Sequence, residues 1–264
     1  MKDMYKKQVA LLIDILLEIA KEDNFALHGG TAINLFHLNM PRLSVDIDLT
    51  FVPFSDNRNE DLHKIRQSLD SVKNRLKATF PNIRFEDEKR AEEEFNRFCE
   101  IKTVSVGQLW GGKLNAALER QHPRDIFDVK NMLQEIDFTE EIKQGFLFFL
   151  LCGKRPIYEV LNPNFTNQRV IFYSQFSGMT NEDFTYREFE KIREELVLIV
   201  NNSLTDKEKD FLLSFSEGNP NWEDFDYSEY PAIKWKLLNI KKLKQDNPIK
   251  FRESIQKLES IRGN

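Results

Sequence analysis

Two aspartates, Asp46 and Asp48, stand one residue apart within the stretch Val45-Asp-Ile-Asp-Leu49. The alternation of apolar and acidic residues predicts a strand that carries both carboxylates on one face. Two carboxylates held this close repel each other unless a cation lies between them, and hard oxygen ligands favour Mg²⁺ or Mn²⁺ over zinc. The pair therefore predicts a divalent metal site, and the alternative is two solvated acids on the outer face of a strand.

The element that must lie beside the acidic strand is the stretch from Phe25 to Thr31. Phe25-Ala-Leu27 is short and apolar, which predicts a buried strand, and a helix is expected to begin at about Thr31. Between them, Gly29 and Gly30 allow the backbone to approach a ligand closely, and free N–H groups at a helix start suit a phosphate. For the glycines alone, a plain strand-to-helix turn is the alternative.

Arg42 precedes the acidic strand and has two open roles. It can form an ion pair with the aspartates, or it can reach a bound triphosphate. Both roles need a guanidinium close to Asp46 and Asp48, so the position of Arg42 in sequence does not choose between them.

A second charged group follows later in the chain. Lys113 and Arg120 are seven residues apart, which places them on a common face of a predicted helix. Pro123 is expected to begin the next helix, with His122 as a capping or core residue and Asp125 in the first turn. Judged from the residues alone, this group is an inter-helix salt-bridge cluster made of Lys113, Arg120, Arg124 and Asp125.

These stretches resemble a known family. Gly29-Gly-Thr31 followed by Asp46-x-Asp48 resembles the signature of the DNA polymerase β-like nucleotidyltransferase superfamily. The fuller stretches Phe25–Phe36 and Pro41–Leu49 resemble the AbiEii/AbiGii toxin family. Later stretches resemble it too, namely Arg155–Pro163, Phe176–Thr180, Phe211–Phe215, Pro220–Trp222 and Trp235–Ile240.

The resemblance implies an activity and partners. It implies transfer of a nucleoside monophosphate from a nucleoside triphosphate to an RNA, with the 3′ end of a tRNA as the expected acceptor. It also implies a toxin that is paired with a separately encoded antitoxin and takes part in phage defence in bacteria. The expected cofactor is Mg²⁺ or Mn²⁺.

The resemblance also implies roles for individual residues. Asp46 and Asp48 match the metal-binding pair. Lys113 and Asp125 match a lysine and an aspartate that complete the nucleotide site, with Asp128 as the alternate for Asp125. The residues expected to bind the nucleotide are Gly29, Gly30, Thr31, Arg42 and Lys113, and the expected catalytic set is Asp46, Asp48, Lys113 and Asp125.

One part of the family pattern is missing. The superfamily often supplies a third carboxylate from a neighbouring strand, and the stretch from Ile83 to Val106 shows no convincing one. Glu86 and Asp87 are a candidate substitute, and a solvated charged helix is the alternative. A degenerate module that binds nucleotide or antitoxin without chemistry therefore stays open. Glycosyl transfer, a third option, does not account for Gly29-Gly-Thr31 or Lys113.

The fold expected from these patterns has two parts. Apolar residues at helical spacing predict helices over about 5–21 and 59–79, and beyond residue 129 the chain is almost wholly helical. Thr205 and Glu208 form a predicted capping box. With the resemblance, this gives an α/β (α+β) nucleotidyltransferase lobe with a small mixed sheet over residues 1–130 and a mainly α-helical domain over 131–264.

The composition limits the partners and the compartment. A net charge of −5 argues against a uniformly basic nucleic-acid binder, so an RNA must meet a local patch. Two cysteines without a metal-ligand spacing, and no apolar run of membrane-spanning length, predict a protein of the reducing cytoplasm with no membrane partner. The candidate phosphate-binding lysines are Lys234, Lys236, Lys241, Lys242, Lys244 and Lys250.

Overall fold

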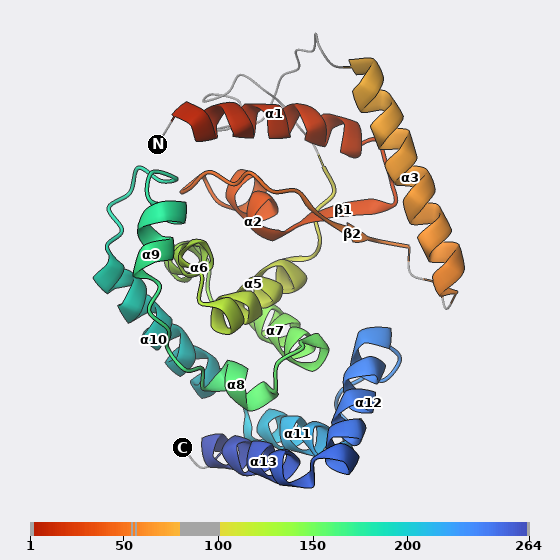
Figure 1. Cartoon of the computed structure of the whole chain (residues 1–264), viewed down its shortest axis with the longest axis vertical. Helices are drawn as coiled ribbons and strands as arrows, with labels where there is room; N and C mark the ends of the chain where they lie inside the picture. Colours follow the sequence, from red (N-terminus) through yellow and green to blue (C-terminus); the bar gives the residue numbers. More distant parts are fainter. Residues whose placement is uncertain (1–2, 54, 56, 80–100, 263–264) are drawn as a thin grey trace. The chain divides into compact units, whose positions relative to one another are not determined.

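The computed structural model describes residues 3–53, 55, 57–79 and 101–262 (Figure 1). The chain divides into two compact units. Unit 1 holds residues 1–105 and 174–183, and unit 2 holds residues 106–173 and 184–264. The expected functional boundary near residue 130 stays a prediction. No described helix is both long enough and apolar enough to cross a membrane.

Unit 1 contains two long helices, α1 (Asp3–Ile19) and α3 (Arg58–Thr79), as the apolar spacing predicts. Arg75 of α3 ties the two together, because its guanidinium lies 3.3 Å from a Glu18 carboxylate oxygen and 2.7 Å from one of Glu22. The apolar face of α1 is buried and consists of Val9, Leu12, Ile13, Leu16 and Ile19. Burial of this stripe is what holds α1 in place.

The sheet of unit 1 consists of two antiparallel strands, β1 (Phe25–His28) and β2 (Asp48–Phe51). The register pairs Phe25 with Phe51 and His28 with Asp48. A parallel bridge joins Leu27 to Thr103 on the other side of β1. The described chain therefore has a small sheet in a mainly helical fold, which is compatible with the expected α+β class.

The connection between β1 and β2 begins at once with helix. The short helix α2 (Gly29–Thr31) continues into the π-helix η1 (Ala32–His37), so helical backbone starts two residues earlier than the sequence indicates. The loop that follows is held by a distant stretch of unit 1. Leu43 N donates to Met179 O at 2.8 Å, and Thr180 Oγ1 donates to Pro41 O at 2.7 Å.

All the regular secondary structure of the described residues in unit 2 is helical. Its elements are α5 (Val106–Arg120), α6 (Pro123–Glu135), α7 (Glu140–Cys152), α8 (Ile157–Leu161), α9 (Arg169–Ile171), α10 (Tyr186–Ser203), α11 (Asp206–Ser216), α12 (Pro231–Asp246) and α13 (Pro248–Arg262). A further π-helix, η2 (Phe172–Phe176), begins in unit 2 and ends in unit 1. The mainly helical character predicted for residues 131–264 is therefore found in 131–262.

Helices α5 and α7 form the centre of unit 2 and touch backbone to backbone. A Cβ placed on Gly111 of α5 would overlap the backbone of Gly145 in α7, and one placed on Gly145 would overlap the carbonyl of Gly107. The glycines thus allow an approach that any side chain would block. On either side of this crossing lie the fully buried Trp110 and Phe146.

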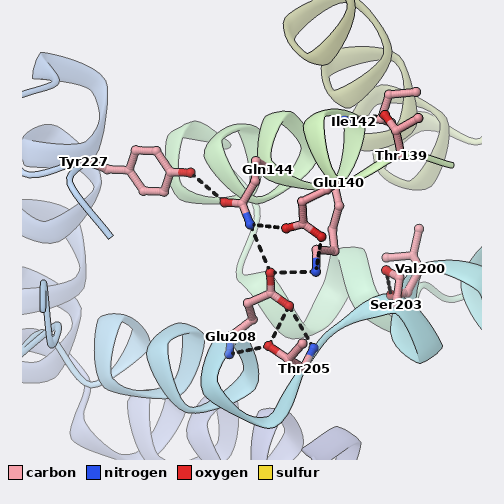
Figure 2. Close-up of polar contacts among 10 residues, drawn as sticks. Thr139, Glu140, Ile142, Gln144, Val200, Ser203, Thr205, Glu208 and Tyr227 are labelled. Atoms are coloured by element: carbon pink, nitrogen blue, oxygen red, sulfur yellow. Dashed lines mark hydrogen bonds and ion pairs between the residues drawn. The ribbon is translucent and has the colours of Figure 1, made fainter. Parts of the chain in front are cut away.

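A buried ion pair joins α7 to α11. Lys143 Nζ lies 3.0 Å from Glu208 Oε1, and Gln144 Nε2 donates to the same oxygen at 3.1 Å. Glu208 also completes the predicted capping box with Thr205, which is confirmed. Figure 2 shows that Tyr227 extends this network by donating to Gln144. Because both charges are paired and further hydrogen-bonded, their burial is tolerated.

We expect Gly145→Ala to destabilise the protein by up to about 2 kcal/mol. Alanine favours a helix over glycine by about 1 kcal/mol, but a methyl group forced against a backbone carbonyl costs about 1–3 kcal/mol or more. The steric term therefore wins. Urea unfolding followed by circular dichroism measures the difference.

Gly112→Ala is the matched control. Helical geometry turns residue 112 roughly 100° away from the Gly111 contact with α7, so only the propensity gain remains and stability should rise slightly. Equal stability changes for the two variants would show that the α5–α7 contact is not as close as described.

Candidate functional site

The two aspartates lie on the exposed side of the hairpin. From residue 45 to residue 52 the side chains alternate between half-buried and exposed, with Asp46 and Asp48 in the exposed set. Regular strand pairing begins only at Asp48, but the alternation extends back through Val45. Both carboxylates are therefore on one side of the chain, as the sequence pattern predicts.

Gly29 is the point where the backbone meets the Asp48 carboxylate. Its φ of +73° lies in the left-handed region, which glycine adopts without strain. A Cβ placed on Gly29 would overlap an Asp48 carboxylate oxygen and would lie 2.9 Å from Asp48 Cγ. The positive φ and the lack of space therefore both require glycine at this position. The space is lacking because the Asp48 carboxylate lies where a side chain of residue 29 would be.

Thr31 connects the same turn to the other aspartate. Its hydroxyl donates to the backbone carbonyl of Asp46, and its side chain is fully buried. The hydroxyl therefore positions the acidic strand against the helix start. The expected contact of Thr31 with a triphosphate stays a prediction.

Arg42 is buried beneath the glycine turn, with 2% of its surface exposed. Its Nη1 donates to Leu43 O at 3.0 Å. A Cβ placed on Gly30 would lie 2.9 Å from Arg42 Nη2 and 3.0 Å from Ser44 Oγ. This position gives Arg42 a structural role, in which Arg42 and Ser44 lie against Gly30. The expected ion pair with the aspartates stays a prediction. A direct contact with a triphosphate stays a prediction.

Unit 2 contains the second charged group, which joins α5 to α6. Lys113 Nζ lies 3.0 Å from Asp125 Oδ1 and 2.9 Å from Asp128 Oδ2, and Arg120 Nη2 lies 3.0 Å from Asp125 Oδ2. Lys113 and Asp125 are almost wholly buried and Asp128 is fully buried. Lys113, Arg120 and Asp125 of the expected salt-bridge cluster are therefore paired, with Asp128 as an additional member, and the part of Arg124 stays a prediction.

The start of α6 explains why the cluster forms there. Pro123 takes the first helical position, and His122 caps the helix because its Nδ1 accepts from Arg124 N at 3.2 Å. Asp125 then lies in the first turn, where the helix dipole favours a negative charge. The predicted capping role of His122 is confirmed.

The described residues fit a divalent cation at the aspartate pair. No group of three or more histidine, cysteine or acidic side chains able to hold a metal occurs in the described part of the chain. Glu86 and Asp87, the candidate source of a third acid, lie outside the described residues. Mg²⁺ in nucleotide sites binds one or two carboxylates and completes its shell with phosphate and water. The carboxylates of Asp46 and Asp48 are therefore enough protein ligands for a Mg²⁺ ion of this kind.

A glycine turn packed against an exposed aspartate pair is the arrangement expected of a nucleotidyltransferase. The sequence model of the family described as "Nucleotidyl transferase AbiEii toxin, Type IV TA system" matches residues 10–96 and 79–237. The chain therefore belongs to this family of nucleotidyltransferase toxins, which implies a nucleoside triphosphate and a cognate antitoxin as partners. Searches of curated proteins and of solved structures returned no match.

Sequence reasoning missed two supports of the glycine turn. Asn34 Nδ2 donates to Gly30 O at 2.9 Å from one turn further along the helix. Met179 and Thr180 hold the loop at Leu43 and Pro41 from a point more than 130 residues away in sequence. A hydrogen-bonding side chain four residues after Gly30 is a usable local signal, whereas the distant contacts leave none.

We expect Lys113→Met to lower the free energy of unfolding by about 3 kcal/mol. Removing one partner of a buried ion pair leaves unpaired buried charge and costs about 3–5 kcal/mol, and here two carboxylates lose their shared cation. Urea unfolding measures the loss. A loss of activity in this variant therefore has to be compared with its folded fraction.

Arg120→Ala tests the same cluster at its surface. The Arg120 side chain is 63% exposed, and an exposed ion pair contributes about 1 kcal/mol or less. A Lys113→Met variant as stable as Arg120→Ala would contradict the buried cluster.

Proposed function

We propose that this protein transfers a nucleoside monophosphate from a nucleoside triphosphate to an RNA and acts as the toxin of a toxin–antitoxin pair in phage defence. The close approach of the Asp48 carboxylate to Gly29 carries the proposal. It places one acid of the exposed pair directly against the backbone of the glycine turn at the start of a helix. Membership of the AbiEii family supports the transferase activity.

In this proposal Asp46 and Asp48 hold Mg²⁺ or Mn²⁺. When bound, the cation would offset negative charge on the triphosphate and make the attacking hydroxyl oxygen a better nucleophile. The chain contributes positioning. Gly29 lets the Asp48 carboxylate lie against the backbone of the turn, and Gly30 does the same for Arg42 and Ser44. The hydrogen bond from Thr31 fixes the strand that carries both acids.

The acceptor is an RNA hydroxyl, and the 3′ end of a tRNA is the specific acceptor that we propose. Its oxygen attacks the α-phosphorus in line. A new bond forms between that oxygen and the α-phosphorus, and the bond from the α-phosphorus to the oxygen shared with the β-phosphorus breaks. Pyrophosphate leaves with the electron pair of the broken bond, and the hydroxyl proton passes to solvent water. Participation of Lys113 and Asp125 in this site stays a prediction, because in the structure their charges are already paired with each other.

The lysines of α12 support the RNA partner, with one correction. Lys234, Lys241 and Lys242 are exposed on the same helix as Trp235, which is 67% exposed. Lysines beside an exposed ring suit a phosphate backbone with unpaired bases. Lys236 was wrongly included in this set, because it is buried and donates to the carbonyls of Leu150 and Arg155.

A second function, nucleotide or antitoxin binding without chemistry, is favoured by one observation. The described residues supply two carboxylates at the hairpin and no third acid close enough to share a metal with them. This alternative predicts Mg²⁺-dependent binding of nucleotide without incorporation into any RNA. Incubation with total RNA and each labelled nucleoside triphosphate separates it from transfer.

We expect Asp46→Ala to abolish transfer of labelled nucleotide to RNA and to abolish growth inhibition. Removal of one of two metal ligands destroys the cation site, whereas the strand stays paired through β1. Asp70→Ala, which removes an exposed acid from α3 of the same unit, should leave both readouts unchanged. Undiminished labelling by the Asp46 variant would refute the proposed site.

We expect the double variant Lys241→Glu, Lys242→Glu to weaken RNA binding at least tenfold. Each lost phosphate contact should reduce the slope of log affinity against log salt by about 1, so the slope should fall by about 2. Filter binding at several salt concentrations measures both quantities.

The control changes the net charge equally at another place. Lys191 of α10 and Lys207 of α11 have highly exposed side chains, and Lys191→Glu with Lys207→Glu should reduce the slope little. Equal effects of the two double variants would mean that net charge, and not the face of α12, determines RNA binding.

A further inference from the structure

Unit 2 contains a cavity of about 330 Å³ between α12, α13 and the segment after α7. These helices are the blue elements of Figure 1. The lining includes three cationic and three aromatic side chains, namely Lys154, Arg155, Lys236, Tyr158, Trp235 and Phe251. None of the described residues that line the cavity is an acid. The cavity therefore combines apolar walls with positive charge.

Lys236 is the most unusual member of the lining, because its ammonium is buried with 8% of the residue exposed. Nζ donates to Leu150 O at 2.7 Å and to Arg155 O at 3.0 Å. An ammonium has three N–H donors, so these two bonds leave one. Within the described residues no carboxylate lies within ion-pair distance of Nζ, so the ammonium has no direct ion pair there.

Burial has a measurable consequence for this ammonium. Desolvation lowers the pKa of Lys236 to about 8, although the carboxylate of Glu119 acts in the opposite direction. The neighbouring thiol adds no negative charge, because burial raises the pKa of Cys152 to about 11. A bound anion would thus supply the compensation that the protein does not.

A structural role explains only part of this arrangement. Leu150 lies in the last turn of α7, where carbonyls lack partners within the helix and favour a cation. Lys236 therefore caps α7. Capping accounts neither for the open cavity beside the ammonium nor for the presence of Lys154 and Arg155 in the same lining. A mostly apolar cavity of a few hundred Å³ with a few convergent polar groups is typical of a small-molecule site.

We propose that this cavity binds an aromatic anion, in which a carboxylate or phosphate meets Lys236 and a planar ring lies against Trp235 and Phe251. Trp235 is 67% exposed and Phe251 is 8% exposed, and both rings line the cavity with Lys236. Binding is non-covalent, since the Cys152 thiol stays protonated at neutral pH. The proposal does not depend on the aspartate pair or on nucleotidyl transfer.

The probes for this site are 1-naphthoate, an aromatic carboxylate, and adenosine monophosphate, an aromatic phosphate. Calorimetric titration of the full chain should show one site per chain for at least one of them. The uncharged counterparts, 1-naphthamide and adenosine, should bind at least tenfold more weakly. Whichever of the two anions binds with the higher affinity shows whether the natural ligand is a free aromatic acid or a nucleotide.

Three variants test the assignment of the site. Lys236→Met keeps an apolar side chain of similar length and should weaken binding of the anion at least tenfold. Lys191→Met removes an exposed lysine from α10 of the same unit, outside the cavity lining, and should bind within twofold of the unchanged protein. Ser254→Phe fills the cavity from α13 while Lys236 stays in place, so it should also abolish binding and serves if Lys236→Met fails to fold.

Several results would overturn the proposal. They are the absence of binding of both anions at millimolar concentration, equal affinity for an anion and its uncharged counterpart, and unchanged affinity in Lys236→Met or Ser254→Phe. Because the readout is calorimetric, a failure here leaves the transfer assay with Asp46→Ala untouched, and a failure of that assay leaves this one untouched.

Discussion

The contact between the Asp48 carboxylate and the backbone of Gly29 is the constraint on which unit 1 depends. It requires glycine at a positive φ, and it fixes the register in which His28 faces Asp48. Because strand residues alternate in direction, that register also decides that Asp46 lies on the exposed side. A slip of one residue between β1 and β2 would bury both acids and would expose the apolar face of the strand.

The parts of unit 1 that follow from local pattern were predictable, and those that follow from distant contacts were not. The apolar run at Phe25–Leu27 and the alternation around Asp46 mark the two strands, because burial on one face leaves a period in the sequence. The burial of Arg42 against Gly30 leaves none, because an arginine at position 42 has the same sequence signature whether it is buried or exposed. The backbone contact of Leu43 with Met179 depends on carbonyl and amide groups, which every residue possesses.

Family membership and geometry give Lys113 two different roles. The structure shows a cation held by Asp125 and Asp128, a pairing that the chemistry of the three residues alone explains. A lysine that is paired with two carboxylates can bind a triphosphate only if phosphate oxygens replace carboxylate oxygens as its partners. Such an exchange would separate Lys113 from Asp128, which is fully buried, and separating a buried ion pair is costly. Asp125 would keep Arg120 as a cation after the exchange.

Helix α12 shows why a count of lysines does not define a binding surface. Lys234 and Lys236 are two residues apart, so helical geometry turns them roughly 200° from each other. One is exposed, whereas the other lies with Ile233 on the buried side. The buried side of α12 therefore contains the ammonium of Lys236. This ammonium lies at the end of α7, where backbone carbonyls lack partners within the helix. Two carbonyl dipoles stabilise an ammonium less than a full negative charge does, and its lowered pKa records the difference. An anion in the adjoining cavity would remove that deficit. The same packing that removes Lys236 from the exposed side of α12, where we propose that RNA binds, therefore makes it suited to a ligand of its own.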